Sequence, residues 1–279
     1  FGAGGYTRGL LSAAPCNRGI AFDRDPNAVP VAQEVAHKWP HRFSFIHDCF
    51  GEMARYVTQP VDGIVFDLGV SSMQIDKPER GFSFRLNGPL DMRMGQAGIS
   101  AKEVVNEFDE TRLADILYRF GEERAAYRIA RALVRARQEK PIVTTAQLAE
   151  IIHHVMPRPK DGSDSAMRSF QAIRIFVNDE LGELQRALEA SPSLLKPGGR
   201  LVVVSFHSLE DRLVKSFMNL NGGLAARPNK YLPETTSQPV LFQVLTKKPI
   251  VPTPAEVTHN PRAHSAKMRV AQRTKSALP

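Results

Sequence analysis

The chain has 279 residues, of which 42% are hydrophobic and 24% are charged, and its formal net charge is +8. This composition is typical of a globular protein and excludes a disordered chain, and no apolar run approaches the roughly 20 residues that a membrane span needs. The positive charge favours a polyanionic partner such as nucleic acid, although charge alone does not decide this.

Short apolar runs alternate with a helical pattern over the first 70 residues. The runs cover residues 18–25, 42–50 and 61–70, and each contains an acidic residue near its end. A helical pattern rich in Ala and Val lies between the first two runs, at Asn27–Lys38. Strands that alternate with helices predict an α/β fold with a mostly parallel sheet.

The ends of these predicted strands carry residues suited to binding a cofactor. The chain opens with a glycine-rich turn, Phe1–Gly5, and Asp23 follows at the distance of about 20 residues that suits a ribose-binding acid. Asp48 and Phe50 end the next strand, and Asp67 ends the one after it. Each feature alone is more often a simple turn, but together they favour a cofactor pocket. A dinucleotide site remains an alternative, although the glycine spacing does not favour it.

The middle of the chain changes character twice. Residues 77–94 have no helical or strand period, but their aromatic and aliphatic residues argue against disorder. Residues 100–156 are helical without strands, and Ser100 and Thr144 each begin a capping-box sequence. A polar break at 160–165 follows, so we predict an inserted helical subdomain.

The strand and helix pattern returns in the last third. Apolar residues from Phe170 to Leu188 recur at helical spacing and predict one long amphipathic helix. The remaining expected elements are a turn at 196–199, a strand at 200–206, a helix at 208–218, a loop at 221–239, and a strand at 240–246 that pairs with 267–270.

Several long motifs then carry a resemblance. The runs DLGVSSMQID from Asp67, ERGFSF, GPLDMRM, SFQAIRIFVNDEL and SFHSLEDRLVK resemble the bacterial 16S ribosomal RNA cytosine-N4 methyltransferase family and its mitochondrial relatives. The resemblance implies a Rossmann-like S-adenosylmethionine-dependent methyltransferase fold. It assigns residues 1–98 and 166–279 to the methyltransferase domain and residues 99–165 to an inserted helical substrate-recognition subdomain. It also implies that the family's first strand belongs before Phe1 and is missing from this sequence.

The same resemblance implies methylation of the exocyclic N4 of a cytidine in small-subunit (16S) ribosomal RNA, near the decoding centre. Carried over residue by residue, it assigns the S-adenosylmethionine site to Gly4, Gly5, Tyr6, Asp23, Phe50, Asp67 and Gln74. Tyr6 stands where many family members have His, so a role that needs an imidazole is not expected there. A contact made by the backbone would survive the change.

Asp67 is the first candidate for a catalytic group. Cytosine N4 is a poor nucleophile because its lone pair is delocalised into the ring, so a hydrogen-bond acceptor would help to localise that pair and to receive developing positive charge. The competing interpretation is that Asp67 binds the cofactor, and the resemblance favours it. The catalytic role is therefore a hypothesis.

Other residues are candidates for binding the RNA, and each has a structural alternative. Ser71 and Ser72 could bind the base edge or form a turn, and Phe82 or Phe84 could stack on an extruded base or pack in the core. Asp91 and Arg93 are also candidates, although they could instead form an internal ion pair, and His207 is a candidate that is more often structural. The last candidates are Arg124, Arg128 and Arg131. Together with Arg135 they share one helical face, which could instead pair with Glu122, Glu123 and Glu139.

Two other function classes stay open. A nicotinamide-dependent oxidoreductase could use a similar sheet, and a non-catalytic RNA-binding factor could keep the fold. No metal site is predicted, because His153 and His154 are adjacent and no ligand cluster accompanies them. The two cysteines make no disulfide framework, and no signal peptide is visible. Both features favour the cytoplasm, with the mitochondrial matrix as the alternative. A homodimer is left open.

Overall fold

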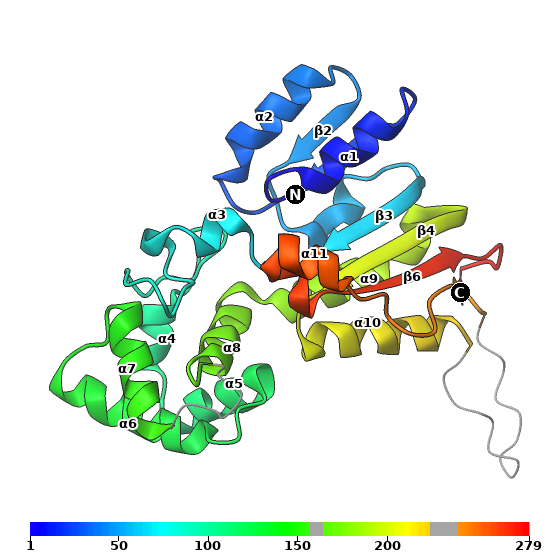
Figure 1. The fold of residues 1–279 in the computed structure, drawn as a ribbon. Helices are drawn as coiled ribbons and strands as arrows, with labels where there is room; N and C mark the ends of the chain where they lie inside the picture. The colour runs from blue at the N-terminus through cyan, green and yellow to red at the C-terminus, as the bar shows by residue number, and fades with distance from the viewer. Residues whose placement is uncertain (157–163, 224–238, 279) are drawn as a thin grey trace, which may run out of the picture. The chain divides into compact units, whose positions relative to one another are not determined.

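The structure is a computed structural model that describes residues 1–156, 164–223 and 239–278. These residues form two compact units (Figure 1). The first unit comprises residues 1–48 and 70–180, and the second comprises residues 49–69 and 181–279. Both units contain helices and strands, which confirms the predicted α/β class. The predicted domain boundaries at 98/99 and 165/166 stay a prediction.

The first unit begins with two helices and two parallel strands. Their bounds are α1 Gly5–Ala13, β1 Gly19–Phe22, α2 Ala28–Lys38 and β2 Phe43–Ile46. The strands pair from Gly19 with Phe43 to Phe22 with Ile46, so their carboxyl ends lie at the same edge. Leu11 of α1 and Val35 of α2 are buried together with Phe43 in one apolar cluster. This arrangement confirms both predicted strands and the helix between them.

The segment at 77–94 is ordered although it is irregular. It follows the single-turn helix α3 (Ser72–Ile75) and begins with a 3-10 helix, η2 (Pro78–Arg80). Leu90 and Met92 are almost completely buried, and both belong to the main apolar cluster of the unit. The apolar residues therefore anchor this segment, as the sequence predicted.

Five helices complete the described part of the first unit. Their bounds are α4 Ala101–Glu107, α5 Glu110–Gly121, α6 Ala126–Glu139, α7 Thr145–Val155 and α8 Met167–Asn178. Both predicted capping boxes are present: Ser100 N donates to Glu103 Oε2 (2.7 Å), and Thr144 N donates to Gln147 Oε1 (3.1 Å). These bonds satisfy backbone donors that a helix start leaves free. The predicted break at 160–165 lies mostly outside the described residues.

The single long helix predicted from Phe170 to Leu188 was wrong. The chain forms α8 and then α9 (Glu180–Leu194), and between them Asp179 takes a left-handed conformation with φ of 48°. The Asn178 side chain donates to Met92 O (2.7 Å) and accepts from Met94 N (2.8 Å). These tertiary bonds accompany the break, whereas the apolar spacing of the sequence continues through it.

The second unit is built on a four-stranded mixed sheet. Its elements are η1 Phe50–Arg55, β3 Val61–Asp67, most of α9, β4 Leu195–Ser205, α10 Ser208–Asn221, β5 Phe242–Val244, α11 Pro254–His259, η3 Pro261–Ser265 and β6 Lys267–Arg273. The strand order is β3-β4-β6-β5, with β3 parallel to β4 and β6 antiparallel to both of its neighbours. The predicted pairing of β5 with β6 is confirmed, and β6 also separates β5 from β4. Helix α10 packs against β4, β5 and β6.

The residues predicted as a turn at 196–199 form a bulge inside β4. Val61 pairs with Leu195 and Gly63 pairs with Arg200, so β4 has extra residues between the two pairings. Gly198 has a φ of 87°, which favours glycine. The predicted loop at 221–239 lies mostly outside the described residues. Among the helices that the structure describes, none is long and apolar enough to cross a membrane.

Candidate functional site

A glycine-rich turn and an acidic residue meet in the first unit. Gly4 N donates to Phe1 O (2.9 Å), and Gly4 has a φ of 75°, which closes the turn before α1. Gly2 N donates to Asp23 Oδ2 (2.7 Å), so the turn lies beside the residue that follows β1. A side chain at Gly5 would meet nothing within 4 Å. The turn therefore offers backbone to a ligand beside a carboxylate, as the predicted cofactor site requires.

Tyr6 lies in the first turn of α1 and is 51% exposed. The backbone N–H groups of the first turn of a helix point towards its N-terminal end, and those of Gly5 and Tyr6 lie in this turn. A backbone contact at Tyr6 is therefore compatible with this position, whereas its side chain remains available to solvent.

Asp25 is a buried acid that the sequence did not single out. Its backbone N donates to Asp23 Oδ1 (2.8 Å), and its own Oδ1 accepts from Asn27 N (2.9 Å). Burial alone raises the pKa of Asp25, but hydrogen bonds from Asn27, Gln74 and Arg80 outweigh it and lower the pKa below its usual value. Asp25 is therefore ionised and shapes the turn that presents Asp23.

Gln74 lies inside the protein and is only 4% exposed. Its Nε2 donates to Asp25 Oδ2 (2.8 Å), and its Oε1 accepts from Ser71 N (3.0 Å). Both ends of the amide are thus used by protein groups. The structure gives Gln74 a positioning role, and direct binding of a cofactor by this side chain stays a prediction. Ser72, at the start of α3, is exposed.

Asp91 and Arg93 form the internal ion pair that was one of the two alternatives. Arg93 Nη2 and Nε donate to the two oxygens of Asp91 (2.7 and 3.0 Å). Desolvation acts to raise the pKa of Asp91, but the bonds from Arg93 lower it overall. Both side chains remain about 30% exposed, so the pair also offers groups to a ligand.

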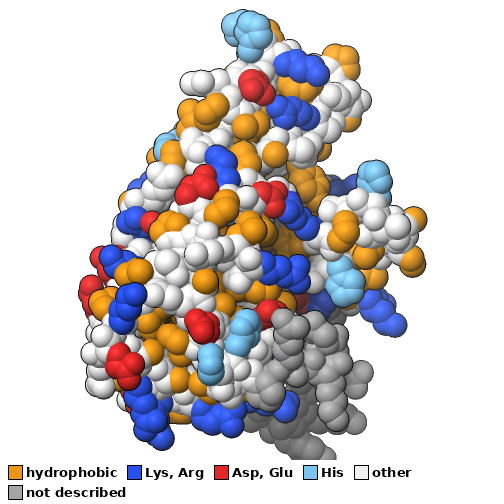
Figure 2. Space-filling model, turned by 60° about the vertical axis from the view of Figure 1, so that its left-hand side comes forward, with side chains coloured by type: hydrophobic (Ala, Val, Ile, Leu, Met, Phe, Trp, Pro, Cys, Tyr) orange, Lys and Arg blue, Asp and Glu red, His pale blue; other side chains and the backbone are white. Residues whose placement is uncertain are grey.

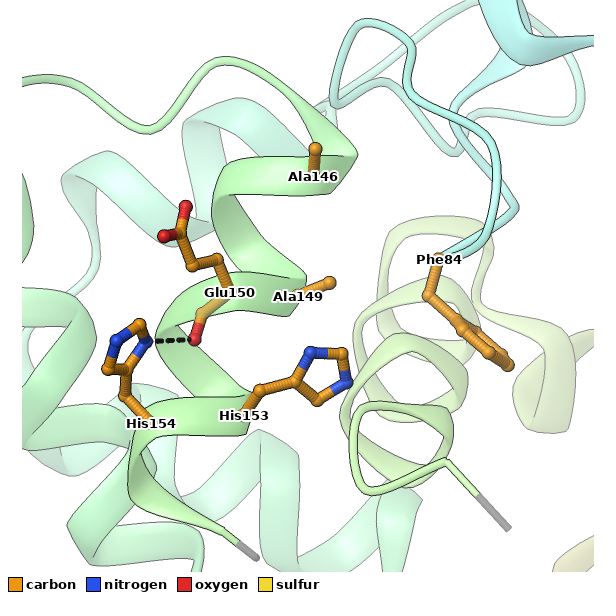
Figure 3. A pocket seen from close by; sticks show the side chains of 6 residues that line it. All are labelled: Phe84, Ala146, Ala149, Glu150, His153 and His154. Atoms are coloured by element: carbon orange, nitrogen blue, oxygen red, sulfur yellow. Dashed lines mark hydrogen bonds between the residues drawn. The ribbon is translucent and has the colours of Figure 1, made fainter. Parts of the chain in front are cut away.

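The two phenylalanines of the irregular segment differ in exposure. Phe82 is 8% exposed and belongs to the main core, which supports the packing alternative for this residue. Phe84 is half-buried and lines a hollow of about 480 Å³ with Ala146, Ala149, Glu150, His153 and His154. Figure 3 shows Phe84 and His153 on the same side of α7, while His154 turns the other way to the Glu150 carbonyl. Of the two rings, Phe84 is the one that a base could reach.

In the second unit, Asp67 ends β3 beside the end of β4. Leu68 N donates to Val204 O (3.0 Å), so the two chains leave the sheet together. Desolvation and the like charge of Glu210 raise the pKa of Asp67. Because Asp67 keeps contact with water, screening limits the size of this shift.

Phe50 opens η1 in the same unit. Its ring lies 5.5 Å from that of Phe66, at an angle of 40°. The next residue, Gly51, donates its N–H to buried Glu183 (2.9 Å), and a side chain at Gly51 would collide with that carboxylate. Glu183 in turn accepts from Arg186 (2.7 Å). These bonds fix the position of Phe50, and its predicted contact with an adenine stays a prediction.

His207 begins α10 as its N-cap. Glu210 N donates to His207 Nδ1 (3.4 Å), and Glu210 Oε2 accepts from Phe206 N (2.8 Å). The imidazole is 8% exposed, and its Nε2 lies 3.2 Å from Glu210 Oε1. These contacts support the structural alternative for His207, and its role in substrate binding stays a prediction.

The predicted arginine face is only partly helical. Arg128 and Arg131 are exposed on α6, whereas Arg124 lies in the turn before that helix. Arg131 pairs with Glu110 (3.3 Å) rather than with the acids named in the alternative, and buried Glu123 accepts from Ala125 N. Arg124 and Arg128 line a hollow of about 370 Å³ beside exposed Tyr127. In the view of Figure 2, Lys and Arg side chains are interspersed with Asp and Glu over the visible face.

The sequence missed the residues that position the site. Asp25, Arg80, Asn178 and Glu183 are buried and polar, and each binds a segment far away in the chain. The local signals were that Asp25 lies two residues after Asp23 and that Arg80 and Asn178 each lie inside one of the recognised motifs.

Comparisons with known proteins complete the description of the site. The MraW methylase family matches residues 1–274. The protein named ribosomal RNA small subunit methyltransferase H from Methylobacterium nodulans is 52% identical over 285 residues, which cover 100% of this chain and 84% of the relative. Proteins with the same name from Paramagnetospirillum magneticum and Dinoroseobacter shibae are 53% and 54% identical; each match covers 98% of this chain, and 88% and 82% of the relative.

Proposed function

This chain belongs to the MraW methylase family, and from that premise we propose that it transfers the methyl group of S-adenosylmethionine to the exocyclic N4 of a cytidine in small-subunit (16S) ribosomal RNA, near the decoding centre. One structural observation supports the proposal most directly. The glycine turn is bonded to Asp23 at the carboxyl end of a strand, which is where an α/β sheet binds its ligand.

The methyl donor suits the groups that the first unit provides. Asp23 Oδ1 and Oδ2 each accept one backbone N–H, and because a carboxylate oxygen can accept more than one hydrogen bond, we assign the ribose hydroxyls to this carboxylate. The open space at Gly5 lets a ligand approach the helix start. Within the second unit, we assign Phe50 to the adenine ring and Asp67 to the reacting groups, as the family resemblance implies.

S-adenosylmethionine supplies a methyl group that is already activated by its sulfonium. The protein therefore has to hold the amino nitrogen in line with it, and positioning of this kind is worth up to roughly 7–11 kcal/mol in favourable systems. In our proposal ionised Asp67 accepts a hydrogen bond from the amino group and compensates the positive charge that develops on N4. The new N–C bond forms as the S–C bond breaks and S-adenosylhomocysteine leaves, and N4 then loses one proton to solvent. A role in holding the cofactor remains the alternative for Asp67.

Contacts with the RNA are assigned to two surfaces of the first unit. Phe84, which belongs to the same irregular segment as the Asp91–Arg93 pair, would stack on the extruded base. Arg128 and Arg131 would bind phosphates, because both side chains are exposed on one face of α6. Arg128 also donates to Val155 O (3.2 Å), and Arg131 is 61% exposed although it pairs with Glu110. We propose a cytoplasmic protein, and the mitochondrial matrix and a homodimer stay open.

The test is methyl transfer to small ribosomal subunits from a strain that lacks this modification. Labelled S-adenosylmethionine is the donor, and mass spectrometry identifies the modified nucleoside. We expect N4-methylcytidine with the wild type and none above background with Asp67→Ala. Asp62→Ala, at the exposed opposite end of β3, is the matched control and retains activity. A folded wild type that binds the cofactor but transfers no methyl group would refute the proposal.

A further inference from the structure

A buried ion pair joins two parts of the first unit. Arg80 Nη1 donates to both oxygens of Asp25 (3.1 and 2.8 Å), and the two side chains are only 7% and 2% exposed. Arg80 Nη2 donates to the carbonyls of Arg93 and Met94 (3.0 and 2.9 Å). One guanidinium therefore holds the turn after β1 and the end of the irregular segment at the same time.

One side of this pair reaches the ribose-binding residue. Asp25 and Asp23 belong to the same tight turn, in which Asp25 N donates to Asp23 Oδ1 (2.8 Å). Asp23 Oδ2 is held by Gly2 N, which belongs to the glycine turn. A movement of this turn, which the Asp25 carboxylate anchors, would therefore move the acceptor proposed for the ribose.

The other side of the pair reaches the groups proposed to bind RNA. Gln74 donates to Asp25 Oδ2 (2.8 Å) and accepts from Ser71 N (3.0 Å), so the carboxylate also fixes the start of α3. The carbonyl of Arg93 binds Arg80, while the Arg93 side chain binds Asp91. Both ends of the segment from Ser71 to Met94 are thus linked to the Asp25 carboxylate, one through Gln74 and the other through Arg80.

From this geometry we infer that Arg80 is a positioning residue that couples the two ligands: through Asp25 it makes occupation of the ribose site raise the affinity for RNA. The inference rests on the proposed function. A buried guanidinium and carboxylate have few alternative partners, so ordering one side of the pair orders the other. Because such coupling is reciprocal, bound RNA also raises the affinity for the cofactor.

The experiment measures the affinity for RNA with and without a saturating amount of S-adenosylhomocysteine, which occupies the cofactor site without reacting. The probe is a fluorescent 16S ribosomal RNA transcript. For the wild type we expect the dissociation constant for RNA to fall by about fivefold or more when the site is occupied, which is the lower end of typical coupling. We call the dissociation constant without S-adenosylhomocysteine divided by that with it the coupling ratio. For Arg80→Lys we expect the coupling ratio to approach one, because an ammonium group cannot reproduce the forked contacts.

A matched control separates coupling from stability. Arg42 is also a partly buried arginine of the first unit, and it donates to the carbonyls of Asn17, Leu11 and Ala14. Arg42→Lys should lower the melting temperature and leave the ratio at its wild-type value. Asp25→Asn keeps the size of the side chain, and its ratio should also approach one. This second variant tests the inference if Arg80→Lys does not fold.

The outcomes are distinct. A ratio that stays at the wild-type value in Arg80→Lys and Asp25→Asn would show that the pair only stabilises the fold. A ratio of one in a wild type that binds both ligands would overturn the coupling and leave the proposed function intact. A folded wild type that binds neither ligand would overturn the proposed function, and this inference with it.

Discussion

Asp23 is the residue whose removal should affect cofactor binding most directly. Its carboxylate is oriented by two backbone N–H groups, at Gly2 and Asp25, and we expect it to accept hydrogen bonds from a ribose. Hydrogen bonds to a charged group are each worth about 1.5–3 kcal/mol, so Asp23→Ala should weaken binding of S-adenosylhomocysteine by about 10- to 100-fold in calorimetry. Asp62→Ala serves again as the control, and equal affinity in Asp23→Ala and the wild type would contradict the assignment.

Asp67 should give the reaction an acidic limit. Its pKa is raised, so the carboxylate takes up a proton at a higher pH than an ordinary Asp, whose pKa is about 3.9. If the ionised form is the acceptor, the single-turnover rate falls as the pH decreases through this raised pKa. The measurement is the rate between about pH 4 and 8 at saturating substrates. A rate that does not fall towards the acidic end of this range would contradict the acceptor role.

The same residue should limit stability. A carboxylate with a raised pKa in the folded state is easier to ionise in the unfolded chain, so its charge disfavours folding at neutral pH. Asp67→Asn removes that charge at nearly constant size. We expect the variant to lose methyl transfer and to melt at a slightly higher temperature than the wild type in calorimetry at pH 7, a common compromise at functional sites. A lower melting temperature would show that the charge helps to hold the fold.

At the scale of elements, the irregular segment depends on close approach of its own backbone. Gly81 has a φ of 72°, and a side chain there would meet Pro89 O and lie 2.7 Å from Asp91 N. Gly98 has a similar φ of 80° but open space around it. Gly98→Ala should therefore cost about 1–2 kcal/mol from conformation alone. Gly81→Ala should cost at least about 1 kcal/mol more, since overpacking adds to strain. Urea unfolding of both variants measures the difference, and equal costs would argue against the steric requirement.

Helix α6 should carry part of the affinity for RNA. Each phosphate contact contributes about 0.7–0.9 to the slope of log affinity against log salt. Replacing Arg128 and Arg131 together by Gln should therefore reduce the slope by about 1.5 and weaken binding at low salt. Arg137 of the same helix is only partly exposed and donates to Val105 O (2.8 Å), so Arg137→Gln should leave the slope unchanged. Fluorescence titration at several salt concentrations gives the slopes, and an unchanged slope in the double variant would place the RNA elsewhere.

For the molecule as a whole, acid should reduce stability in both units. Bonds from charged or polar neighbours lower the pKa of Asp25 and Asp91 in the first unit, against desolvation, and a bond from Arg269 lowers that of Asp211 in the second. Such groups stabilise the fold above their ordinary pKa, and this stabilisation is lost as the pH falls through the lowered values. Urea midpoints should thus be level near neutrality and fall below about pH 4. Asp211→Asn should flatten that dependence, and an unchanged pH dependence would contradict it.

Local features of the fold were predictable, and features that depend on distant residues were not. The capping boxes at Ser100 and Thr144 were visible because their partners lie three residues away. The break at Asp179 was not, because the bonds that accompany it come from a segment more than 80 residues earlier. The insertion of β6 between β4 and β5 was missed for the same reason.

The candidate site divides along the same line. Asp23 and Asp67 could be predicted as site residues because each follows a predicted strand, and ligands of α/β sheets bind at the carboxyl ends of the strands. Arg80 could not be recognised as the partner of Asp25, which lies 55 residues away. Whether Phe82 or Phe84 faced the core depended on how the irregular segment folds, and neither composition nor period determines that.

The position of β6 in the sheet also affects how the chain is made. Strand β4 needs β6 as its neighbour, but Lys267 is translated 62 residues after Ser205. At about 5–20 residues per second, the edge of β4 waits roughly 3–12 s for its partner during synthesis. That edge contains Leu201, Val202 and Val203, and an unpaired apolar edge is a template for wrong pairing. The nascent chain therefore passes through a short period in which binding of a chaperone, or a low concentration of nascent chains, would raise the yield of folded protein.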